Sequence, residues 1–334
     1  MAAEPVMGAL PADVVVRRAT DAGSRRPTAP AASFALLAAA ATVAWVGVAA
    51  LQRSGGLLSG LSAGRAELLA PPVLAVVGAV TVAERLWPAE RRRLLSRGHV
   101  QDAGFFLLHV TVVVALMTLF SVAFASLLEH RAGWLAGTWT DRLPVGLVFG
   151  LSLVMMDGAN WIAHWADHRF TALWRMHALH HSQEELSVLT SFRAHPLSHL
   201  PGFLLASIPA FALTGHRGIA PQLVIVYVCL GTIPHANVRW SYGPLGRLVV
   251  SPAYHRLHHA ADGRSGKNLG VVLTVWDLLA GRARFPDGSG WPARTGLAGR
   301  PVPVEQDAGA PLPPRLLWLQ LRDPFRSGPA NGPP

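Results

Sequence analysis

The fold is decided by residues 144–181, which read PVGLVFGLSLVMMDGANWIAHWADHRFTALWRMHALHH. Residues 144–163 carry one charged side chain, Asp157, and are long and apolar enough for a helix that crosses a bilayer. Five histidines come directly afterwards, and they are His164, His168, His177, His180 and His181. The stretch therefore predicts a membrane helix that leads into a histidine-rich segment.

The composition of the whole chain agrees with a membrane protein. Of its 334 residues 51% are apolar and 14% charged, against roughly 25% charged in ordinary soluble domains. The net charge of +10 comes almost entirely from arginine, since Lys267 is the only lysine. These arginines flank apolar stretches, so we expect them to meet anionic lipid and expect no nucleic-acid partner. A single cysteine, Cys229, excludes a disulfide framework, a cysteine zinc finger and an intrinsic iron–sulfur cluster.

Four apolar runs predict membrane helices, at 34–51, 68–83, 104–128 and 144–163. The first is interpreted as an uncleaved helix instead of a twin-arginine signal peptide, because Pro27 follows Arg25-Arg26 and more spans come later. Two shorter pieces, 203–213 and 219–233, predict a hairpin whose first arm is too short to span upright and is re-entrant or interfacial. The predicted fold is an all-α integral membrane protein, a bundle of about four transmembrane helices plus a short hairpin, with a cytosolic histidine-rich helical cap.

The placement of arginine orients these helices. Arg85, Arg91, Arg92, Arg93 and Arg97 lie between the second and third runs, which predicts a cytoplasmic loop there. Alternation then places the N-terminus and the histidine-rich segments in the cytoplasm. A composition rich in Ala, Gly, Arg and Pro is typical of a high-G+C bacterial genome, so we expect a bacterial plasma membrane.

The chain divides into four predicted parts. Residues 1–33 are an Ala/Pro-rich flexible tail, and 34–67 are an extra N-terminal transmembrane helix and loop. Residues 68–285 form the membrane-embedded domain, and 286–334 a Pro/Gly-rich C-terminal tail that wraps around the domain or dangles free.

Histidine spacing indicates a metal site. The pattern HxxHH occurs at 177–181 and again at 255–259, although a single copy is expected about 0.03 times by chance in this composition. On a helix, residues three and four apart share one face, so two imidazoles of each triad can reach one metal and the third can serve a second. Together with the pair His164 and His168 these ligands exceed the needs of one tetrahedral site and predict two metals. His235, where the last apolar run ends, is a ninth candidate.

Several other polar residues are candidates for contacts to the ligands. A carboxylate at membrane depth needs a partner, so Asp157 ranks first among the nearby acids. His195 and His199 are four apart in HPLSH, but Pro196 interrupts helix geometry, so they are interpreted as outer contacts or additional ligands. Asp277 orients a ligand or caps a helix. The remaining acids near the histidines, for which a solvated or capping role is expected, are Asp167, Glu184, Glu185 and Asp262.

The histidine boxes and their flanks resemble the fatty acid hydroxylase/sterol desaturase superfamily. The stretches that carry the resemblance are ERLWP at 84–88, HWADHR at 164–169, LWRMHALHHS at 173–182, TSFRAHP at 190–196, HAN at 235–237, PAYHRLHH at 252–259, NLG at 268–270 and WDLLAG at 276–281. The resemblance covers about residues 80–285. Trp165, Ser187 and His199 depart from residues common in the family, and none of the three departures removes a principal histidine.

The resemblance implies a helical membrane bundle with a cytosolic cap that holds a dinuclear centre. It implies two iron ions (zinc in some purified forms), O2 as co-substrate, a membrane lipid as substrate and an external electron-donor protein or reductase. The ligands that it implies are His164, His168, His177, His180, His181, His235, His255, His258 and His259.

The leading hypothesis is therefore an O2-dependent hydroxylase acting on a fatty acyl, sterol or isoprenoid-type lipid. A desaturase or ketolase would use the same histidine boxes. A non-redox metal-binding or transport protein is an alternative from a different class, but it predicts ligands spread through the bilayer midplane on facing helices. A degenerate structural relative would not be expected to keep all the principal histidines.

Overall fold

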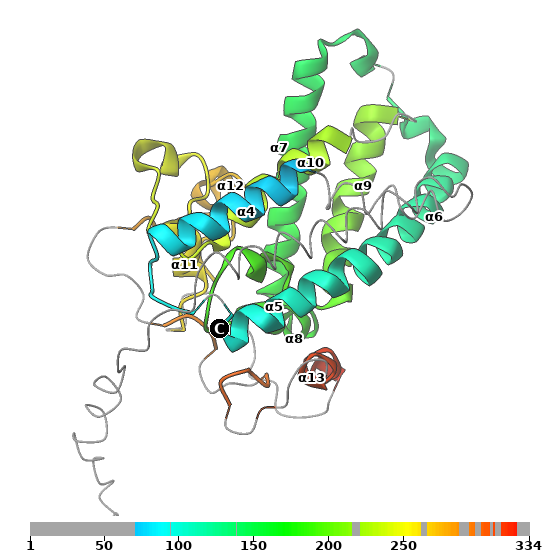
Figure 1. The fold of residues 1–334 in the computed structure, drawn as a ribbon. Helices are drawn as coiled ribbons and strands as arrows, with labels where there is room; N and C mark the ends of the chain where they lie inside the picture. Colours follow the sequence, from blue (N-terminus) through cyan, green and yellow to red (C-terminus); the bar gives the residue numbers. More distant parts are fainter. Residues whose placement is uncertain are drawn as a thin grey trace, which may run out of the picture.

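The computed structural model describes residues 71–93, 95–137, 139–215, 221–261, 266–286, 294–297, 302–307, 310 and 315–325. In this part of the chain the regular structure is helical, and extended pairing is limited to three isolated bridges (Figure 1). The predicted tail 1–33, the predicted helix and loop 34–67, and Asp262 lie outside the described residues. The predicted all-α class is confirmed.

The helices follow the chain from α4 to α13. Their bounds are α4 Pro71–Leu86, α5 Arg97–Leu108, α6 Val114–Ala132, α7 Val145–Asp167, α8 Thr171–His181, α9 Leu200–Thr214, α10 Pro221–Thr232, α11 Pro252–His258, α12 Val275–Leu279 and α13 Arg315–Arg322. A π-helical turn, His109–Val113, joins α5 to α6, and short 3₁₀ turns occupy Gly133–Leu135, Trp139–Arg142, Val188–Phe192, Pro196–His199, Ile233–His235, Gly243–Arg247 and Asp323–Phe325.

Three helical stretches in the described residues are long and apolar enough to cross a membrane. They are Arg97–Leu135, Val145–Asp167 and Pro196–Thr214. The first contains the run predicted at 104–128, and the second contains all but the first residue of the run predicted at 144–163. The run predicted at 68–83 coincides largely with α4, whose 16 residues are about 24 Å long. In Figure 1, α7 and α9 run side by side, and α4 lies along α10.

The first arm of the predicted hairpin is longer than expected. The 3₁₀ turn Pro196–His199 runs directly into α9, so the helical stretch has 19 residues and rises about 28 Å, close to the 30 Å hydrocarbon thickness of a bilayer. The prediction of an arm too short to span is therefore wrong. It took the apolar run alone and missed the polar turn, in which Pro196 occupies the first position, where its missing N–H costs nothing.

The C-terminal region packs onto the body of the molecule. Leu316 on α13 is buried, and Leu317 and Leu321 pack in the cluster around Phe105 of α5. Gln101 Nε2 of α5 donates to Gln320 Oε1 at 2.9 Å with both side chains fully buried. Helix α13, in the predicted tail, therefore packs against α5.

Candidate metal centre

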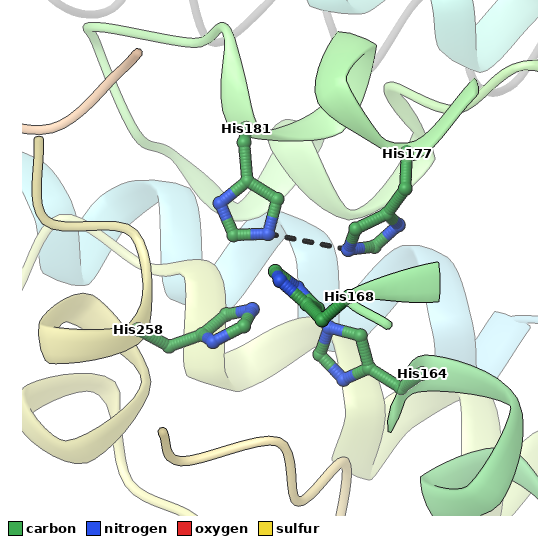
Figure 2. A group of neighbouring side chains, drawn as sticks. All are labelled: His164, His168, His177, His181 and His258. Carbon is green, nitrogen blue, oxygen red and sulfur yellow. Dashed lines mark hydrogen bonds between the residues drawn. The ribbon is translucent and has the colours of Figure 1, made fainter. Parts of the chain in front are cut away.

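Two groups of histidines lie at the C-terminal end of α7, close to α8 and α11. The first group contains His164 from the last turn of α7, His168 at its C-cap, His177 and His181 from α8, and His258 from α11. One ring nitrogen from each lies within 4.8 Å of the others. Figure 2 shows the five imidazoles directed toward a common centre from three helices.

The second group contains His180, His235, His255 and His259, all of them buried. Their Nε2 atoms form a chain of close approaches, 3.1 Å from His180 to His235, 3.0 Å from His235 to His255, and 3.2 Å from His255 to His259. His235 comes from the 3₁₀ turn after α10, so the last apolar helix delivers a member of this group.

Each HxxHH triad is divided between the two groups. On α8, His177 and His181 are four residues apart and face the first group, while His180 faces the second. On α11 the arrangement is reversed, because His255 and the following His259 face the second group and His258 faces the first. This is the division that the helical spacing predicted for two adjacent metals. All nine candidate histidines are brought together, and their role as ligands stays a prediction.

The separations between the nitrogens fit metal ligands. Nitrogens about 2.05 Å from a shared ion lie about 3.3 Å apart in a tetrahedral arrangement and about 2.9 Å apart at neighbouring octahedral positions. The measured 3.0–3.2 Å contacts in the second group lie between these values. In the first group His177 Nε2 and His181 Nε2 are 3.2 Å apart. The donor set therefore fits two ions, and an all-imidazole set suits iron, zinc, copper or nickel.

Buried nitrogens without a hydrogen-bond partner support the same interpretation. Nε2 of His164, Nε2 of His258 and both ring nitrogens of His168 are buried and unpartnered in the first group. Leaving a buried polar atom unsatisfied costs about 1–3 kcal/mol, so several in one place indicate a missing partner. One metal ion would satisfy Nε2 of His164, Nε2 of His258 and one nitrogen of His168, since the two nitrogens of a single imidazole cannot bind the same ion.

Burial keeps the histidines of α8 and α11 neutral. It lowers the pKa of His180 to about 3, and it lowers the pKa values of His181, His255 and His258 well below their usual range, with the neighbouring imidazoles adding to the effect. Desolvation disfavours the charged imidazolium, and only a neutral imidazole has a free lone pair for a metal.

Backbone carbonyls and one hydroxyl hold the outer nitrogens of the rings. His164 Nδ1 lies 2.7 Å from the carbonyl oxygen of Leu269, and His258 Nδ1 lies 2.9 Å from that of Lys267. His180 Nδ1 contacts the carbonyl of Arg193 at 3.2 Å. Ser191 Oγ lies 3.1 Å from His235 Nδ1. A carbonyl only accepts, so each imidazole facing one carries its proton on Nδ1 and leaves Nε2 free.

Asp157, Asp277, His195 and His199, which were predicted to contact the histidine ligands, have different surroundings. Asp157 accepts hydrogen bonds from Val272 N, Leu273 N, Trp276 Nε1 and Tyr227 OH, and from no histidine in the described residues. Asp277 accepts from Leu269 N at 3.0 Å and Gly270 N at 2.7 Å, so it fixes the loop that contacts His164.

The other two candidates, His195 and His199, lie at the two ends of the 3₁₀ turn before α9. His195 Nδ1 accepts from Leu197 N at the start of that turn. His199 packs edge-to-face on His109 at 4.9 Å, and its Nε2 is buried without a partner. Neither belongs to a histidine group in the described residues.

Two further side chains contact the histidines, and for the first of them, Asp167, a solvated or capping role was expected. Asp167 Oδ2 lies 3.6 Å from His177 Nδ1, the closest carboxylate–histidine approach in the described residues. Trp174 is 4% exposed and packs against His168 and His181. Its position three residues before His177 on the same helix is the signal that sequence reasoning missed.

A cavity of about 240 Å³ borders both groups. One wall is formed by members of the two groups, His164 and His177 from the first and His180, His235 and His255 from the second. The cavity is also lined by residues of α7, α9, α10 and the turn before α9, which are Asn160, Ala163, Ser198, His199, Gly202 and Gly231. A molecule in the cavity would therefore touch both candidate metal positions and the helices that lie in lipid.

Part of the chain is similar to known proteins. The fatty acid hydroxylase family model matches residues 149–282. An ornithine lipid hydroxylase of Rhizobium tropici is 30% identical over 220 residues, which cover 64% of this chain and 66% of that protein. Alkylglycerol monooxygenases of Caenorhabditis elegans and Homo sapiens are 28% and 27% identical over 38% and 37% of the chain, and the matches span only 25% and 27% of those proteins. No solved structure matches.

The family match spans α7, α8, α11 and α12, and so includes all nine histidines of the two groups. Together with the histidine boxes and the relatives, it shows that this all-α membrane protein belongs to the fatty acid hydroxylase/sterol desaturase superfamily.

Proposed function

We propose that the protein is a lipid monooxygenase that hydroxylates a membrane lipid with O2 at a dinuclear iron centre. The observation that carries this proposal is the pair of adjacent histidine groups, both bordering one cavity that reaches the membrane helices. A transporter would place its ligands along the membrane path, whereas these histidines gather at the ends of the helices.

Each group would hold one ion, with His164, His168, His177, His181 and His258 around the first and His180, His235, His255 and His259 around the second. When bound, a pair of iron ions supplies the O2 activation that side chains lack. The overall reaction consumes the lipid, O2, two electrons and two protons, and yields the hydroxylated lipid and water. A separate donor protein or reductase would supply the electrons.

The substrate is proposed to be a lipid with a polar headgroup and an alkyl chain. Relatives named for ornithine lipid and alkylglycerol support the lipid class. Ala163, Gly202 and Gly231 on the cavity wall are small, and a Cβ at Gly202 would lie 2.8 Å from Asn160 Oδ1. The narrow space beside these residues suits an alkyl chain that enters between α7, α9 and α10.

We further propose a bacterial plasma-membrane location with the histidine groups on the cytoplasmic side, because arginines are concentrated between α4 and α5 at this end. Residues 68–285 would form the catalytic domain, with 286–334 wrapped against it. The segments 1–33 and 34–67 would be a tail and an additional helix.

The test is expression of the chain in a bacterial host, followed by mass spectrometry of the total lipids with ¹⁸O2 or ¹⁶O2. We expect a lipid gaining one oxygen atom that carries ¹⁸O, and no such product from His258→Ala, whose membrane level is matched to the wild type. Loss of two hydrogens would identify a desaturase instead. A product without ¹⁸O, or one that persists in His258→Ala, would contradict the proposal.

A further inference from the structure

The two histidine groups are held by two different segments of the chain. For the first group the segment is 267–269, which lies between α11 and α12. Lys267 O contacts His258 Nδ1 at 2.9 Å, and Leu269 O contacts His164 Nδ1 at 2.7 Å. One short segment therefore orients two imidazoles that come from helices far apart in the sequence.

Asn268 lies between these two carbonyls and is fully buried. Its φ of 57° is in the left-handed region, where asparagine is tolerated better than most residues. Its amide Nδ2 donates to Tyr254 O at 2.9 Å and to Arg284 O at 2.8 Å, and its Oδ1 accepts from Arg284 N at 2.6 Å. The turn at Asn268 thus sets the directions of the carbonyls of Lys267 and Leu269.

For the second group the segment is 191–193, at the end of the 3₁₀ turn Val188–Phe192. Ser191 Oγ contacts His235 Nδ1 at 3.1 Å, and Arg193 O contacts His180 Nδ1 at 3.2 Å. The fully buried Arg193 guanidinium fixes this segment, since it pairs with Asp102 at 3.2 Å and with Glu305 at 2.6 Å.

We propose that the two metal positions are tuned independently, the first by Asn268 through the segment 267–269 and the second by Ser191. Both are positioning residues, because each acts through a histidine or a carbonyl that contacts one. The inference rests on the proposed function only in that the histidines bind metal. Loss of an outer contact to a metal ligand typically weakens metal affinity 10–100-fold.

The experiment is a zinc titration of purified chain, stripped of metal, with a competing chelator in two backgrounds. His168→Ala/His258→Ala disables the first group, and His255→Ala/His259→Ala disables the second. Asn268→Ala is expected to weaken zinc 10–100-fold where only the first group remains, and less than twofold where only the second remains. Ser191→Ala is expected to do the reverse, and Ser191→Thr, which keeps the hydroxyl, restores affinity.

Thermal unfolding of each stripped variant separates loss of fold from loss of a site. Asn268→Gly serves as a second variant, because glycine adopts the positive φ while lacking the amide. Equal weakening of both groups by either variant, or no weakening by any of them, would overturn the independent tuning while leaving the enzyme proposal intact. A wild-type chain that binds no zinc would overturn both, and selective tuning without any oxygenated lipid would overturn the enzyme proposal alone.

Discussion

Asp157 is predicted to stabilise the segment 272–276, which follows Val271 of the cavity wall, although it accepts from no histidine in the described residues. Its carboxylate is fully buried in α7 and accepts from Val272 N and Leu273 N, both at 3.0 Å, and from Trp276 Nε1 at 2.9 Å. Tyr227 OH donates to it at 3.3 Å. These contacts fasten residues 272–276 to the middle of a membrane helix.

Replacing this carboxylate removes the partner of one buried donor, Val272 N, and of two half-buried donors, Leu273 N and Trp276 Nε1. Asp157→Ala leaves three N–H groups unsatisfied at about 1–3 kcal/mol each, or about 3–9 kcal/mol, a large part of the 5–15 kcal/mol that stabilises a typical protein. In Asp157→Asn the amide oxygen can accept from Leu273 N and Trp276 Nε1, and the NH2 group can donate to Tyr227 OH. Only Val272 N then faces another donor and loses its hydrogen bond. We therefore expect a smaller loss of about 1–3 kcal/mol.

The assay is thermal unfolding in detergent, monitored by size-exclusion chromatography, with Ser152→Ala on the same helix as the matched control. We expect the midpoint to fall in the order wild type, Asp157→Asn, Asp157→Ala, with Ser152→Ala close to wild type. An Asp157→Ala variant as stable as the wild type would refute the role assigned to these hydrogen bonds.

Three further changes test the cavity and the C-terminal contacts. Gly202→Leu should lower the hydroxylation rate at least tenfold and leave the metal content unchanged. Its Cβ would lie 2.8 Å from Asn160 Oδ1, and the side chain would fill the cavity. An unchanged rate would place the substrate elsewhere. Glu305→Ala should lower stability by about 1–3 kcal/mol, since the buried Arg193 loses one charged partner and keeps Asp102. An unchanged melting midpoint would show that the contact is dispensable. His199→Phe should keep the metal content but change the position of the new hydroxyl group on the lipid, because His199 Nε2 is a buried polar atom in the cavity wall. Fragmentation of the product by mass spectrometry locates this hydroxyl group. An identical product from the wild type and the variant would count against this role.

The histidine pattern was readable from sequence because helical geometry is periodic. The spacing of His177, His180 and His181 fixes which rings share a face once α8 forms, and the mirrored triad on α11 completes the two groups. The long apolar helices were predictable for a similar reason, since length and hydropathy decide them.

The contacts that hold the rings were not readable in this way. Lys267 and Leu269 act through backbone carbonyls, which every residue type possesses, so their identities carry no signal. Asp157 was expected beside a ligand because a carboxylate in a membrane helix needs a partner. Asp157 does have hydrogen-bond partners, but they are backbone N–H groups and Trp276 of a segment distant in the sequence. The sequence alone cannot show which donors fold back onto α7.

The sequence did not decide whether the C-terminal segment packs against the domain, for a related reason. Its Pro/Gly-rich composition is typical of a tail, whereas Glu305 and Gln320 become structural only through buried partners on other elements. Such long-range pairing depends on the folded bundle and has no local sequence signature.

The measurement that tests the central claim most directly is metal content per chain of the purified protein, with the wild type compared to His180→Ala/His258→Ala. The two substitutions remove one histidine from each group. The account predicts two irons per chain in the wild type and their loss in the double variant at equal folding. One zinc or no metal in the wild type, unchanged by the substitutions, would contradict it.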